Sequence, residues 1–416
     1  MLLTVLKSTD MYKTVLDQTL VKYMVTDRPS IVFYRTAYGT MGGATKMFQR
    51  LLENINTSEF DITLVSQRED TVCRRAMELG IDTEIVPYPG VLDTYDGKLL
   101  EMSTHKKGVA ALRLLQHNWM FREQVNKPDM VWCSGTRSFA MLLPYFNVTD
   151  VESIWNIGLL KESAGKMKYI NEAILRTADY IFIESRKQAK RQLTRRQYNT
   201  HKDKFNIIHK GIDINKYNPK KVERSAKGDE CHVGTAALIN PRKGLEHFIE
   251  AASLIKETDI DSNIKFTIAG TTAREDDSRY KRQLKNLIQE NGLEENVEFL
   301  GWVDDMPQYL HTLDVFILPS YNEGIPGVIR EALAMKTPVI ATDVGGVSEA
   351  VINGKNGFLV KPGDKDRIAE KTLYLLTNPT ERKRMGERGR QHIINNFTIK
   401  SYVETYTSHF KQISSR

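Results

Sequence analysis

Long apolar runs are absent from this sequence, and their absence excludes one broad class of protein. No stretch of about 18 consecutive apolar residues occurs, which is the length that a helix needs to cross a bilayer, so we expect no membrane-spanning helix. The first 30 residues also lack a continuous apolar segment, because charged residues such as Lys7, Asp10 and Lys13 recur in them. We therefore expect no secretory signal.

Cysteine is scarce as well. The chain has only three cysteines, Cys73, Cys133 and Cys231, and none belongs to a Cys-x-x-Cys pair. Scattered cysteines of this kind are typical of reduced thiols in a cytoplasmic protein. No group of His, Asp, Glu and Cys has the spacing of metal ligands, and the acidic pairs at 276–277 and 304–305 are typical of turns and helix caps. We predict no metal requirement.

What is present is the composition of a globular protein. The chain has 416 residues, of which 41% are hydrophobic and 27% are charged. This length exceeds what one compact core accommodates and suits two domains of about 200 residues each. The net charge of +7 and the pI of about 9.0 favour anionic partners without saying which.

Short apolar runs of strand length recur along the chain and alternate with helical segments. Such alternation predicts parallel sheets covered by helices on both faces, so the fold class is α/β with two doubly wound sheets. The first strand leads into a glycine-rich loop, and a helix is expected from about Ala44 to Leu52. The expected strands are residues 31–34, 62–65, 83–86, 130–133, 153–156 and 180–183 in the first half, and 233–238, 266–270, 297–301, 313–318, 338–342 and 357–360 in the second.

The most informative pattern is a strand, a tight loop and a helix start at residues 313–335. Pro326 fits the first turn of the expected helix, because its missing N–H has no partner there in any case. Gly324 and Gly327 let the backbone approach a ligand closely. A helix N-terminus that follows such a loop offers N–H groups and a positive dipole end to a phosphate.

Two carboxylates bracket this loop. Glu323 lies at its mouth, and Glu331 follows in the second turn of the expected helix. A carboxylate at Glu331 suits a sugar diol, because it can accept hydrogen bonds from two hydroxyl groups. Taken alone, such a pair is far more often unrelated to ligand binding: Glu331 would be an ordinary surface residue of the helix, and Glu323 a neighbour of its N-cap.

The stretch 323–346 resembles the donor-site signature of the family 4 retaining glycosyltransferases, which have the GT-B fold. That signature contains two glutamates separated by seven residues, as here. The stretch 207–219 is similar to the segment that joins the two domains in this family. Gly211 and Tyr217 match it, and Lys210 stands in place of the usual asparagine.

This resemblance implies two Rossmann-like domains that face each other across a cleft, and a C-terminal helix that crosses back to the first domain. We expect a helical N-terminal extension at 1–28, which could dock on the body of the protein or on a lipid surface. An acceptor-side domain would follow at 29–210, a nucleotide-sugar donor domain at 211–395 and the returning helix at 396–416.

The resemblance also implies roles for individual residues. Glu331 would hold the ribose, and Glu323 would hold the donor sugar. Lys243 would neutralise the diphosphate, as the lysine of a Lys-Gly pair does in the family. The family often also has an arginine just after the strand, where this chain has Ala236, Ala237 and Leu238, and Arg242 would supply that charge instead. The expected catalytic residues are therefore Glu323, Lys243 and Arg242. The other donor-binding residues that it implies are Gly324, Ile325, Pro326 and Gly327 at the helix start, Gly301, Trp302 and Val303 beside the nucleobase, and Gly42 and Gly43 near the donor phosphates.

A histidine of the family also has no counterpart in this sequence. Many members carry a histidine after a strand of the first domain, near the donor sugar. The matching place here is residues 133–137, which read Cys-Ser-Gly-Thr-Arg without a histidine. The catalytic roles of the first domain are therefore left open.

The predicted function is that of a retaining, metal-independent hexosyl-type glycosyltransferase in the cytoplasm. It would move a sugar from a nucleotide diphosphate sugar to a glycolipid, a polysaccharide or another glycoconjugate acceptor. The nucleotide sugar is a substrate, so no cofactor is expected. The alternatives are another GT-B enzyme, either a nucleotide-sugar epimerase or a glycosyl phosphorylase, and a non-catalytic protein that binds sugar nucleotides.

Residues 161–204 are rich in basic side chains, with twelve Lys or Arg against five Asp or Glu. Two interpretations stay open: a solvated helix face, or a surface for an anionic membrane or a phosphorylated acceptor. Few aromatic residues interleave with the basic ones, so no nucleic-acid partner is expected. The positions through which the protein would sit on the inner face of a membrane are Arg186, Lys187, Lys190, Arg191, Arg195 and Arg196.

Overall fold

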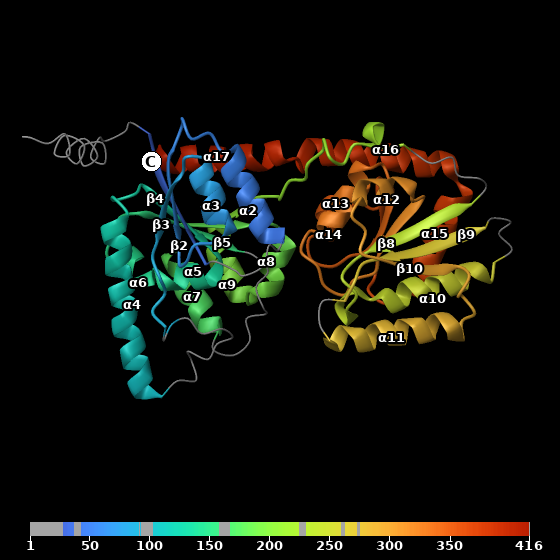
Figure 1. Ribbon diagram of the computed structural model, residues 1–416, viewed down its shortest axis with the longest axis horizontal. Helices are drawn as coiled ribbons and strands as arrows, with labels where there is room; N and C mark the ends of the chain where they lie inside the picture. Colours follow the sequence, from blue (N-terminus) through green and yellow to red (C-terminus); the bar gives the residue numbers. More distant parts are fainter. Residues whose placement is uncertain are drawn as a thin grey trace, which may run out of the picture.

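Two parallel sheets stand side by side, each covered by helices (Figure 1). The computed structural model describes residues 28–36, 43–90, 92, 103–157, 167–223, 230–258, 263–272 and 275–415. The helix predicted within residues 1–28 and most of the glycine-rich loop, including Gly42, lie outside the described residues. The arrangement confirms the predicted α/β class with two doubly wound sheets.

The first sheet has seven parallel strands in the order β3-β2-β1-β4-β5-β6-β7. The strands are β1 (Ser30–Arg35), β2 (Asp61–Ser66), β3 (Asp82–Ile85), β4 (Met130–Ser134), β5 (Glu152–Ile157), β6 (Tyr180–Ile183) and β7 (Phe205–Ile207). The helices of this part are α2 (Gly43–Asn54), α3 (Thr71–Glu78), α4 (Thr104–Gln124), α5 (Gly135–Met141), α6 (Leu143–Phe146), α7 (Met167–Thr177), α8 (Arg186–Gln192), α9 (Arg195–His201) and the short η3 (Lys202–Lys204).

The second sheet has six parallel strands in the order β10-β9-β8-β11-β12-β13. The strands are β8 (Cys231–Ala236), β9 (Ile264–Ala269), β10 (Val297–Gly301), β11 (Val315–Leu318), β12 (Val339–Thr342) and β13 (Gly357–Val360). Its helices are η4 (Pro219–Lys221), η5 (Pro241–Lys243), α10 (Leu245–Lys256), α11 (Glu275–Glu290), α12 (Met306–Thr312), α13 (Gly327–Ala334), α14 (Val347–Ala350), α15 (Lys365–Thr377) and α16 (Pro379–Asn396), and the chain ends with α17 (Ile399–Ser414).

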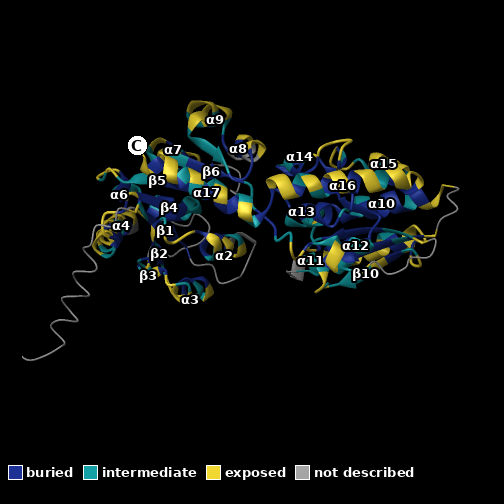
Figure 2. Cartoon of the chain, turned by 90° about the horizontal axis from the view of Figure 1, so that it is seen from above, coloured by how far each residue is buried: buried dark blue, intermediate teal, exposed yellow. Residues whose placement is uncertain are grey.

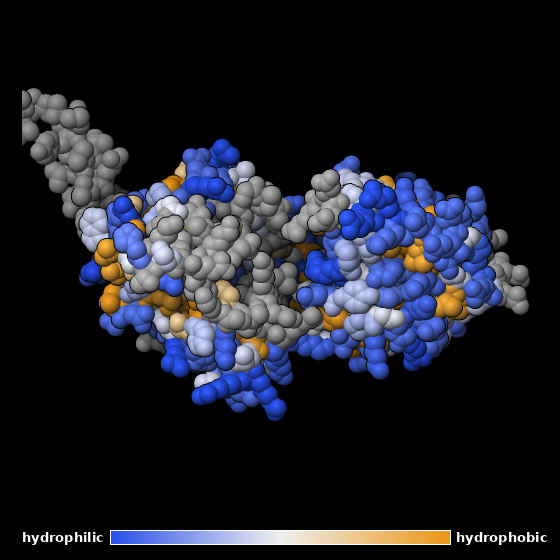
Figure 3. Space-filling view, turned by 90° about the horizontal axis from the view of Figure 1, so that it is seen from below, coloured by the Kyte–Doolittle hydropathy of each residue, from blue (hydrophilic) through white to orange (hydrophobic). Residues whose placement is uncertain are grey.

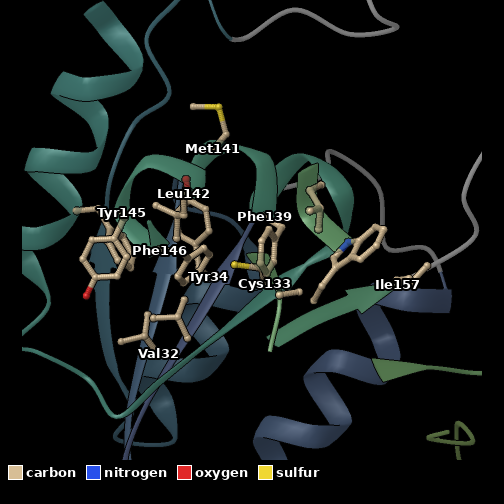
Figure 4. Close-up of a cluster of buried hydrophobic side chains, with 14 of the residues drawn as sticks. Val32, Tyr34, Cys133, Phe139, Met141, Leu142, Tyr145, Phe146 and Ile157 are labelled. Carbon is tan, nitrogen blue, oxygen red and sulfur yellow. The ribbon is translucent and has the colours of Figure 1, made fainter. Parts of the chain in front are cut away.

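Alternate residues of β1 point to opposite faces of the first sheet, as the pleat of a strand requires. Val32 and Tyr34 pack into one hydrophobic cluster, whereas Ile31 and Phe33 pack into another on the opposite face. Figure 4 shows Val32 and Tyr34 beside Phe139, which α5 supplies. Because helices cover both faces, the strands are continuous apolar runs rather than alternating ones.

The last helix, α17, leaves the second domain and packs on the first, where its red ribbon runs above α2 and α3 (Figure 1). Its side chains Tyr402, Val403, Tyr406 and Phe410 belong to the same core cluster as the strands of the first sheet. The Tyr406 hydroxyl donates a hydrogen bond to Oδ1 of Asn156 in β5 at 3.1 Å. The C-terminal helix therefore crosses back to the first domain, as predicted.

One strand lies two residues earlier than the sequence pattern indicated. The prediction was 233–238, whereas β8 comprises Cys231–Ala236. Ala236, opposite Ala269, is its last paired residue, and Leu238 is 45% exposed. The apolar residues just beyond the strand extended the sequence pattern past its end.

Candidate active site

The strand order of the second sheet identifies where a ligand would bind. β8 and β11 are neighbours, and the remaining strands are added outward from them in opposite directions. In open parallel sheets, ligands bind beyond the carboxyl ends of the strands at such a switch point. The two segments that follow these strands, residues 237–244 and 319–326, contain six of the thirteen predicted site residues, including the three predicted to be catalytic.

Hydrogen bonds and one close approach hold these two segments together. The N–H of Tyr321 donates to the carbonyl oxygen of Arg242 at 2.9 Å, and Nη1 of Arg242 donates to the carbonyl oxygen of Asn322 at 3.1 Å. Gly244 has a φ of +60°, and a Cβ atom there would collide with the carbonyl oxygen of Pro319. Only glycine fits both conditions, so the Lys-Gly sequence fixes the distance between the segments.

The three residues predicted to be catalytic meet at this junction. Nζ of Lys243 lies 2.5 Å from Oε1 of Glu323, and Nη1 of Arg242 lies 4.0 Å from Oε2 of the same carboxylate. The Lys243 and Glu323 side chains are only 13% and 8% exposed. Because water is largely excluded, the attraction between the two charges is stronger than it would be at the surface.

The helix α13 begins at Gly327, directly after the loop that carries Glu323. Pro326 is its N-cap, with φ −62° and ψ 132°, one position before the first turn in which it was predicted. A proline is harmless at either position, because neither requires an N–H. Ile325 is 4% exposed, so its side chain packs in the core and only its backbone can face a ligand.

The loop before α13 is braced from behind by the segment that follows β12. The N–H of Gly346 donates to the carbonyl oxygen of Gly324 at 2.9 Å. Gly345 has a φ of +53°, and a Cβ atom there would overlap the carbonyl group of Glu323. Gly345 and Gly346 thus support the backbone that carries the Glu323 carboxylate.

Glu331 lies in the second turn of α13, where it forms a hydrogen bond with the hydroxyl group of Tyr217. Burial raises the pKa of the Glu331 carboxyl group, and the hydrogen bond from Tyr217 and the positive charges of Arg330, Lys216 and Lys46 only partly offset this. Lys46 belongs to α2 of the first domain, so the two domains approach each other at this carboxylate. Sequence reasoning missed Lys46, which carries no local signal.

The predicted nucleobase segment follows β10, the edge strand, two strands away from the switch point. The carbonyl oxygen of Gly301 accepts a hydrogen bond from the N–H of Gly270 at 2.6 Å, which joins the ends of β10 and β9. The indole of Trp302 is 69% exposed, and its Nε1 donates to Oδ1 of Asp304 at 2.8 Å. Val303 packs against the core beneath. Trp302 is thus the only one of the three that presents a large side chain to solvent.

The arginine next to Glu331, Arg330, has a structural partner in the segment that joins the domains. Arg330 donates from Nη1 to the carbonyl oxygen of Lys210 and from Nη2 to that of Ile325, the latter at 3.2 Å. Nζ of Lys210 in turn lies 3.1 Å from the Glu184 carboxylate. The lysine that replaces the usual asparagine of the family therefore forms part of the domain junction.

Two further contacts cross from the first domain to the second. Nε2 of His209 lies 2.7 Å from Oε2 of Glu349, and Nζ of Lys187 lies 2.6 Å from Oδ1 of Asp343. Lys187 also donates to the hydroxyl group of Ser348 at 3.0 Å. Of the basic residues predicted to face a membrane, Lys187 thus bridges the domains, although its side chain remains 48% exposed.

The part of the chain that the structure describes contains neither a cluster of metal ligands nor a membrane-spanning helix. Within these residues, no three His, Cys, Asp or Glu side chains gather closely enough to hold a metal ion. No described helix combines the length and the apolar character needed to cross a bilayer.

Comparison with known proteins relates part of this chain to a protein family. Residues 218–392 match the family described as Glycosyl transferases group 1. The chain is 31% identical over 196 residues to the capsular polysaccharide biosynthesis glycosyltransferase CapM of Staphylococcus aureus, an alignment that covers 45% of this chain and 49% of the relative. It is 29% identical over 208 residues to the UDP-Gal:alpha-D-GlcNAc-diphosphoundecaprenol alpha-1,3-galactosyltransferase of Escherichia coli, covering 48% and 52%. The chain spans about half the length of the curated relatives it matches.

Solved structures match nearly the whole chain. A glycosyltransferase from Rickettsia africae superposes with a TM-score of 0.74 at 17% identity, covering 93% of this chain and 99% of that one. Anabaena HepE in complex with UDP superposes with a TM-score of 0.71 at 17% identity, covering 92% and 100%. At this level of identity the likeness establishes the fold, which is GT-B.

Proposed function

We propose that this protein transfers a hexosyl group from a nucleotide diphosphate sugar to a glycoconjugate acceptor, because residues 218–392 match the family described as Glycosyl transferases group 1. The observation that carries the proposal is the Lys243–Glu323 pair at the switch point, beside the N-terminus of α13. A cation, a carboxylate and a set of backbone N–H groups then converge where a diphosphate and a sugar would lie.

The proposed chemistry uses these groups in separate roles. As the bond between the sugar and the diphosphate breaks, negative charge grows on the leaving oxygen, and Lys243, Arg242 and the first N–H groups of α13 stabilise it. An ammonium group has three N–H donors, so Lys243 can bond to Glu323 and to a phosphate oxygen together. The acceptor hydroxyl attacks from the same face and passes its proton to the leaving phosphate, which retains the anomeric configuration.

Glu323 and Glu331 would bind different parts of the donor. Glu331, close to α2 of the first domain, would accept hydrogen bonds from the ribose hydroxyls, and Glu323 would hold the sugar that is transferred. No metal ion or cofactor is needed for this scheme, because the protein itself supplies the cations. The nucleotide to test first is UDP, which is bound in the structure of Anabaena HepE.

The acceptor is proposed to be a glycan or a lipid-linked sugar, bound mainly by the first domain. Two observations on relatives support this. The Escherichia coli enzyme is named for a diphosphoundecaprenol-linked acceptor, and the Staphylococcus aureus protein for capsular polysaccharide biosynthesis. The protein would then work in the cytoplasm, at the inner face of a membrane.

A transfer assay with the purified protein tests the proposal. Labelled UDP-hexoses are incubated with lipid-linked sugar acceptors, and the anomeric configuration of the product is read by NMR. Glu323→Gln should lower the turnover by about a hundredfold or more while UDP still raises the melting temperature. Conversion of the donor to an epimer without transfer would favour the epimerase alternative. Full turnover by Glu323→Gln would contradict the assigned role.

A further inference from the structure

The outer face of α4 is apolar where a surface helix is normally polar. Leu112, Leu115 and Trp119 are 70%, 57% and 63% exposed, and Val109 is 38% exposed. Among the helices that the structure describes, no other carries more than one large hydrophobic side chain with comparable exposure. The inner face of the same helix is also apolar, because Ala110 and Phe121 belong to the core. The exposed apolar residues are therefore not needed to pack α4 on the first domain.

These side chains form one continuous stripe. At 100° per residue, Leu112, Leu115 and Trp119 lie within about 60° of each other around the helix axis. Figure 2 shows α4 at the end of the molecule that lies far from the second domain, with exposed residues along it. Figure 3 shows hydrophobic surface at that same end of the first domain. The stripe is therefore accessible to a large partner.

Basic residues border the stripe on both sides. The same helical geometry places Arg113 on one side of the stripe and Arg122 on the other, and both are exposed. His105 and Lys107 are exposed near the N-terminal end of α4. The helix has one acidic residue, Glu123, in its last turn. An apolar stripe flanked by cations is the pattern of a helix that lies in the plane of a membrane interface.

We propose that α4 docks this protein on the surface of a membrane that contains anionic lipids. Leu112, Leu115 and Trp119 would enter the boundary between headgroups and acyl chains, where an exposed tryptophan is especially favourable. Arg113 and Arg122 would keep their long side chains alongside and place their charges among the lipid phosphates. The proposal concerns binding alone and does not rest on the proposed transfer reaction.

A hollow beside the stripe fits the same partner. It lies between α4 and the chain after β3, and Arg113 lines it together with Val109 and Met120 from the helix and Tyr88 from the opposite wall. A lipid headgroup that entered this hollow would meet the Arg113 guanidinium, which currently donates to Oε1 of Gln116 at 2.7 Å. The hollow thus adds a place at which an arginine of α4 would bind the phosphate of a lipid headgroup.

A second copy of the chain fits this surface less well than a membrane does. In a two-fold symmetric contact, the same patch lies on both sides. Two α4 helices would bring two sets of arginine, lysine and histidine side chains together with a single acidic residue from each copy. Like charges in such a contact repel each other. An anionic bilayer offers the opposite charge.

The basic residues of α8 and α9 are a less suitable membrane surface. Lys187 is engaged with Asp343 of the second domain, and Nζ of Lys190 lies over the ring of Tyr198 at 5.5 Å. No large exposed hydrophobic side chain accompanies them among the described residues of these two helices. Charge without an apolar stripe gives weak attachment that salt readily screens.

Vesicle flotation tests the proposal with the full chain. Vesicles of phosphatidylcholine alone are compared with vesicles that contain equal amounts of phosphatidylglycerol and phosphatidylcholine. We expect binding to the anionic vesicles, weakened by added salt. The double variant Leu112→Ser with Trp119→Ser should lose at least about tenfold in apparent affinity. Arg113→Ser and Arg122→Ser should each weaken binding to the anionic vesicles by about fivefold.

A matched control replaces the same number of exposed apolar side chains elsewhere. Met77 on α3 and Ile394 on α16 are 49% and 36% exposed, and Met77→Ser with Ile394→Ser should bind vesicles as the unaltered protein does. Equal binding by the α4 variant and the unaltered protein would overturn the proposal, as would the absence of any vesicle binding.

Two other occupants of the stripe have distinct signatures, and either would overturn the proposal. If a second copy covers it, the unaltered protein will sediment as a dimer without binding vesicles, and Leu112→Ser with Trp119→Ser will sediment as a monomer. If residues 1–27 of the same chain cover it, that variant will melt at a lower temperature than the unaltered protein. A membrane surface predicts a melting temperature that is unchanged or higher, because the removed side chains are exposed.

Discussion

At the residue scale, the Lys243–Glu323 pair is the strongest local dependence in the site. Both side chains are largely shielded from water, so removing Glu323 leaves Lys243 as an uncompensated charge. Removing Lys243 leaves Glu323 with only the more exposed Arg242, at 4.0 Å. Lys243→Met or Glu323→Gln alone should each lower the free energy of unfolding by about 3 kcal/mol. Denaturant titration of the purified variants measures this.

The double variant separates the ion pair from the packing around it. Lys243→Met combined with Glu323→Gln leaves no unpaired charge, so its stability should be closer to that of the unaltered protein than the sum of the single losses predicts. Lys265→Met is a suitable control, because its partner Glu298 lies at the surface, with side-chain exposures of 42% and 51%. If Lys265→Met lowered the free energy of unfolding as much as Lys243→Met does, the burial of the Lys243–Glu323 pair would not explain the loss.

The ionised Glu331 carboxylate should lower the stability of the fold while it contributes to nucleotide binding. Burial raises its pKa, so the folded state favours the protonated form, and the ionised carboxylate weakens the fold. This unfavourable contribution appears as the pH rises above the range of an ordinary glutamate and is complete above the raised pKa of the folded state. Glu331→Gln should therefore melt at a higher temperature than the unaltered protein at neutral pH and above.

The same substitution should weaken nucleotide binding. If Glu331 accepts hydrogen bonds from the ribose, the loss of a charged acceptor should lower the affinity for UDP by about tenfold to a hundredfold. Calorimetric titration measures the affinity, and a deoxyribose nucleotide provides the control, since it should distinguish the two proteins less. Equal affinity for UDP in both proteins would place the ribose elsewhere.

The residues of the site differ in how far sequence could predict them. Glu323, Glu331 and Lys243 lie in local patterns of strand, loop and helix start, from which the sequence predicted a common crevice. The structure brings Glu323 and Lys243 together. Tyr217 and Lys46 reach Glu331 from other parts of the chain. Their positions depend on how the domains and the joining segment pack, which no local pattern records.

At the element scale, α17 is the brace that ties the end of the chain to the first domain. Phe410 is fully buried, and its ring contacts those of Phe33, Phe60 and Phe182 with centroid distances of 5.9, 6.0 and 6.3 Å. Phe410→Ala should lower the free energy of unfolding by about 3–5 kcal/mol, because it leaves a cavity among these rings. Thermal and denaturant unfolding of the variant measure the loss.

A control for this prediction lies one residue further along the helix. Lys411 is 58% exposed and pairs with Glu59, so Lys411→Ala should change the stability by less than about 1 kcal/mol. Phe410→Leu should fall between the two, since it retains most of the buried volume. A negligible effect of Phe410→Ala would mean that α17 is not docked on the first domain in solution.

The elements themselves were largely predictable, and their ends were less so. Every strand expected from an apolar run is present, because buried parallel strands must be apolar on both faces. β7 was not predicted as a separate strand, and it is short and only half-buried. β8 was placed too late because Ala237 and Leu238 continue the apolar run after pairing has ended at Ala236. Pattern alone does not mark where a strand loses its partner.

At the scale of the whole molecule, several of the described contacts between the domains are ionic. They include the pairs of His209 with Glu349 and of Lys187 with Asp343, and the clamp of Arg330 on the carbonyl oxygen of Lys210. Interfaces of this kind permit relative motion of domains. Their partners lie far apart in sequence, which is why the sequence predicted a cleft but none of the contacts across it.

The contact at Glu349 should make the domain arrangement sensitive to acid. Burial alone would raise the pKa of Glu349, but hydrogen bonds from His209, from the Ser185 hydroxyl and from the backbone of Arg186 outweigh it, and the pKa is lowered. The stabilisation from a carboxyl group with a lowered pKa is present above its unfolded value and is lost as the pH falls through the folded value. We therefore expect the domains to separate more readily below the pH range in which an ordinary glutamate titrates. X-ray scattering over that range should show a rising radius of gyration, while circular dichroism shows that both domains remain folded.

Two variants decide whether Glu349 is responsible for this response. Glu349→Gln removes the titrating group, so its radius of gyration at neutral pH should already exceed that of the unaltered protein and should change less on acidification. Glu298→Gln removes a carboxylate whose partner, Lys265, lies in the same domain, so its response should match that of the unaltered protein. The pair of Lys187 with Asp343 is 48% and 45% exposed and therefore contributes little at physiological salt. An acid response that persisted in Glu349→Gln would assign the opening to another group, such as Glu184, which lies 3.9 Å from Arg330 of the second domain.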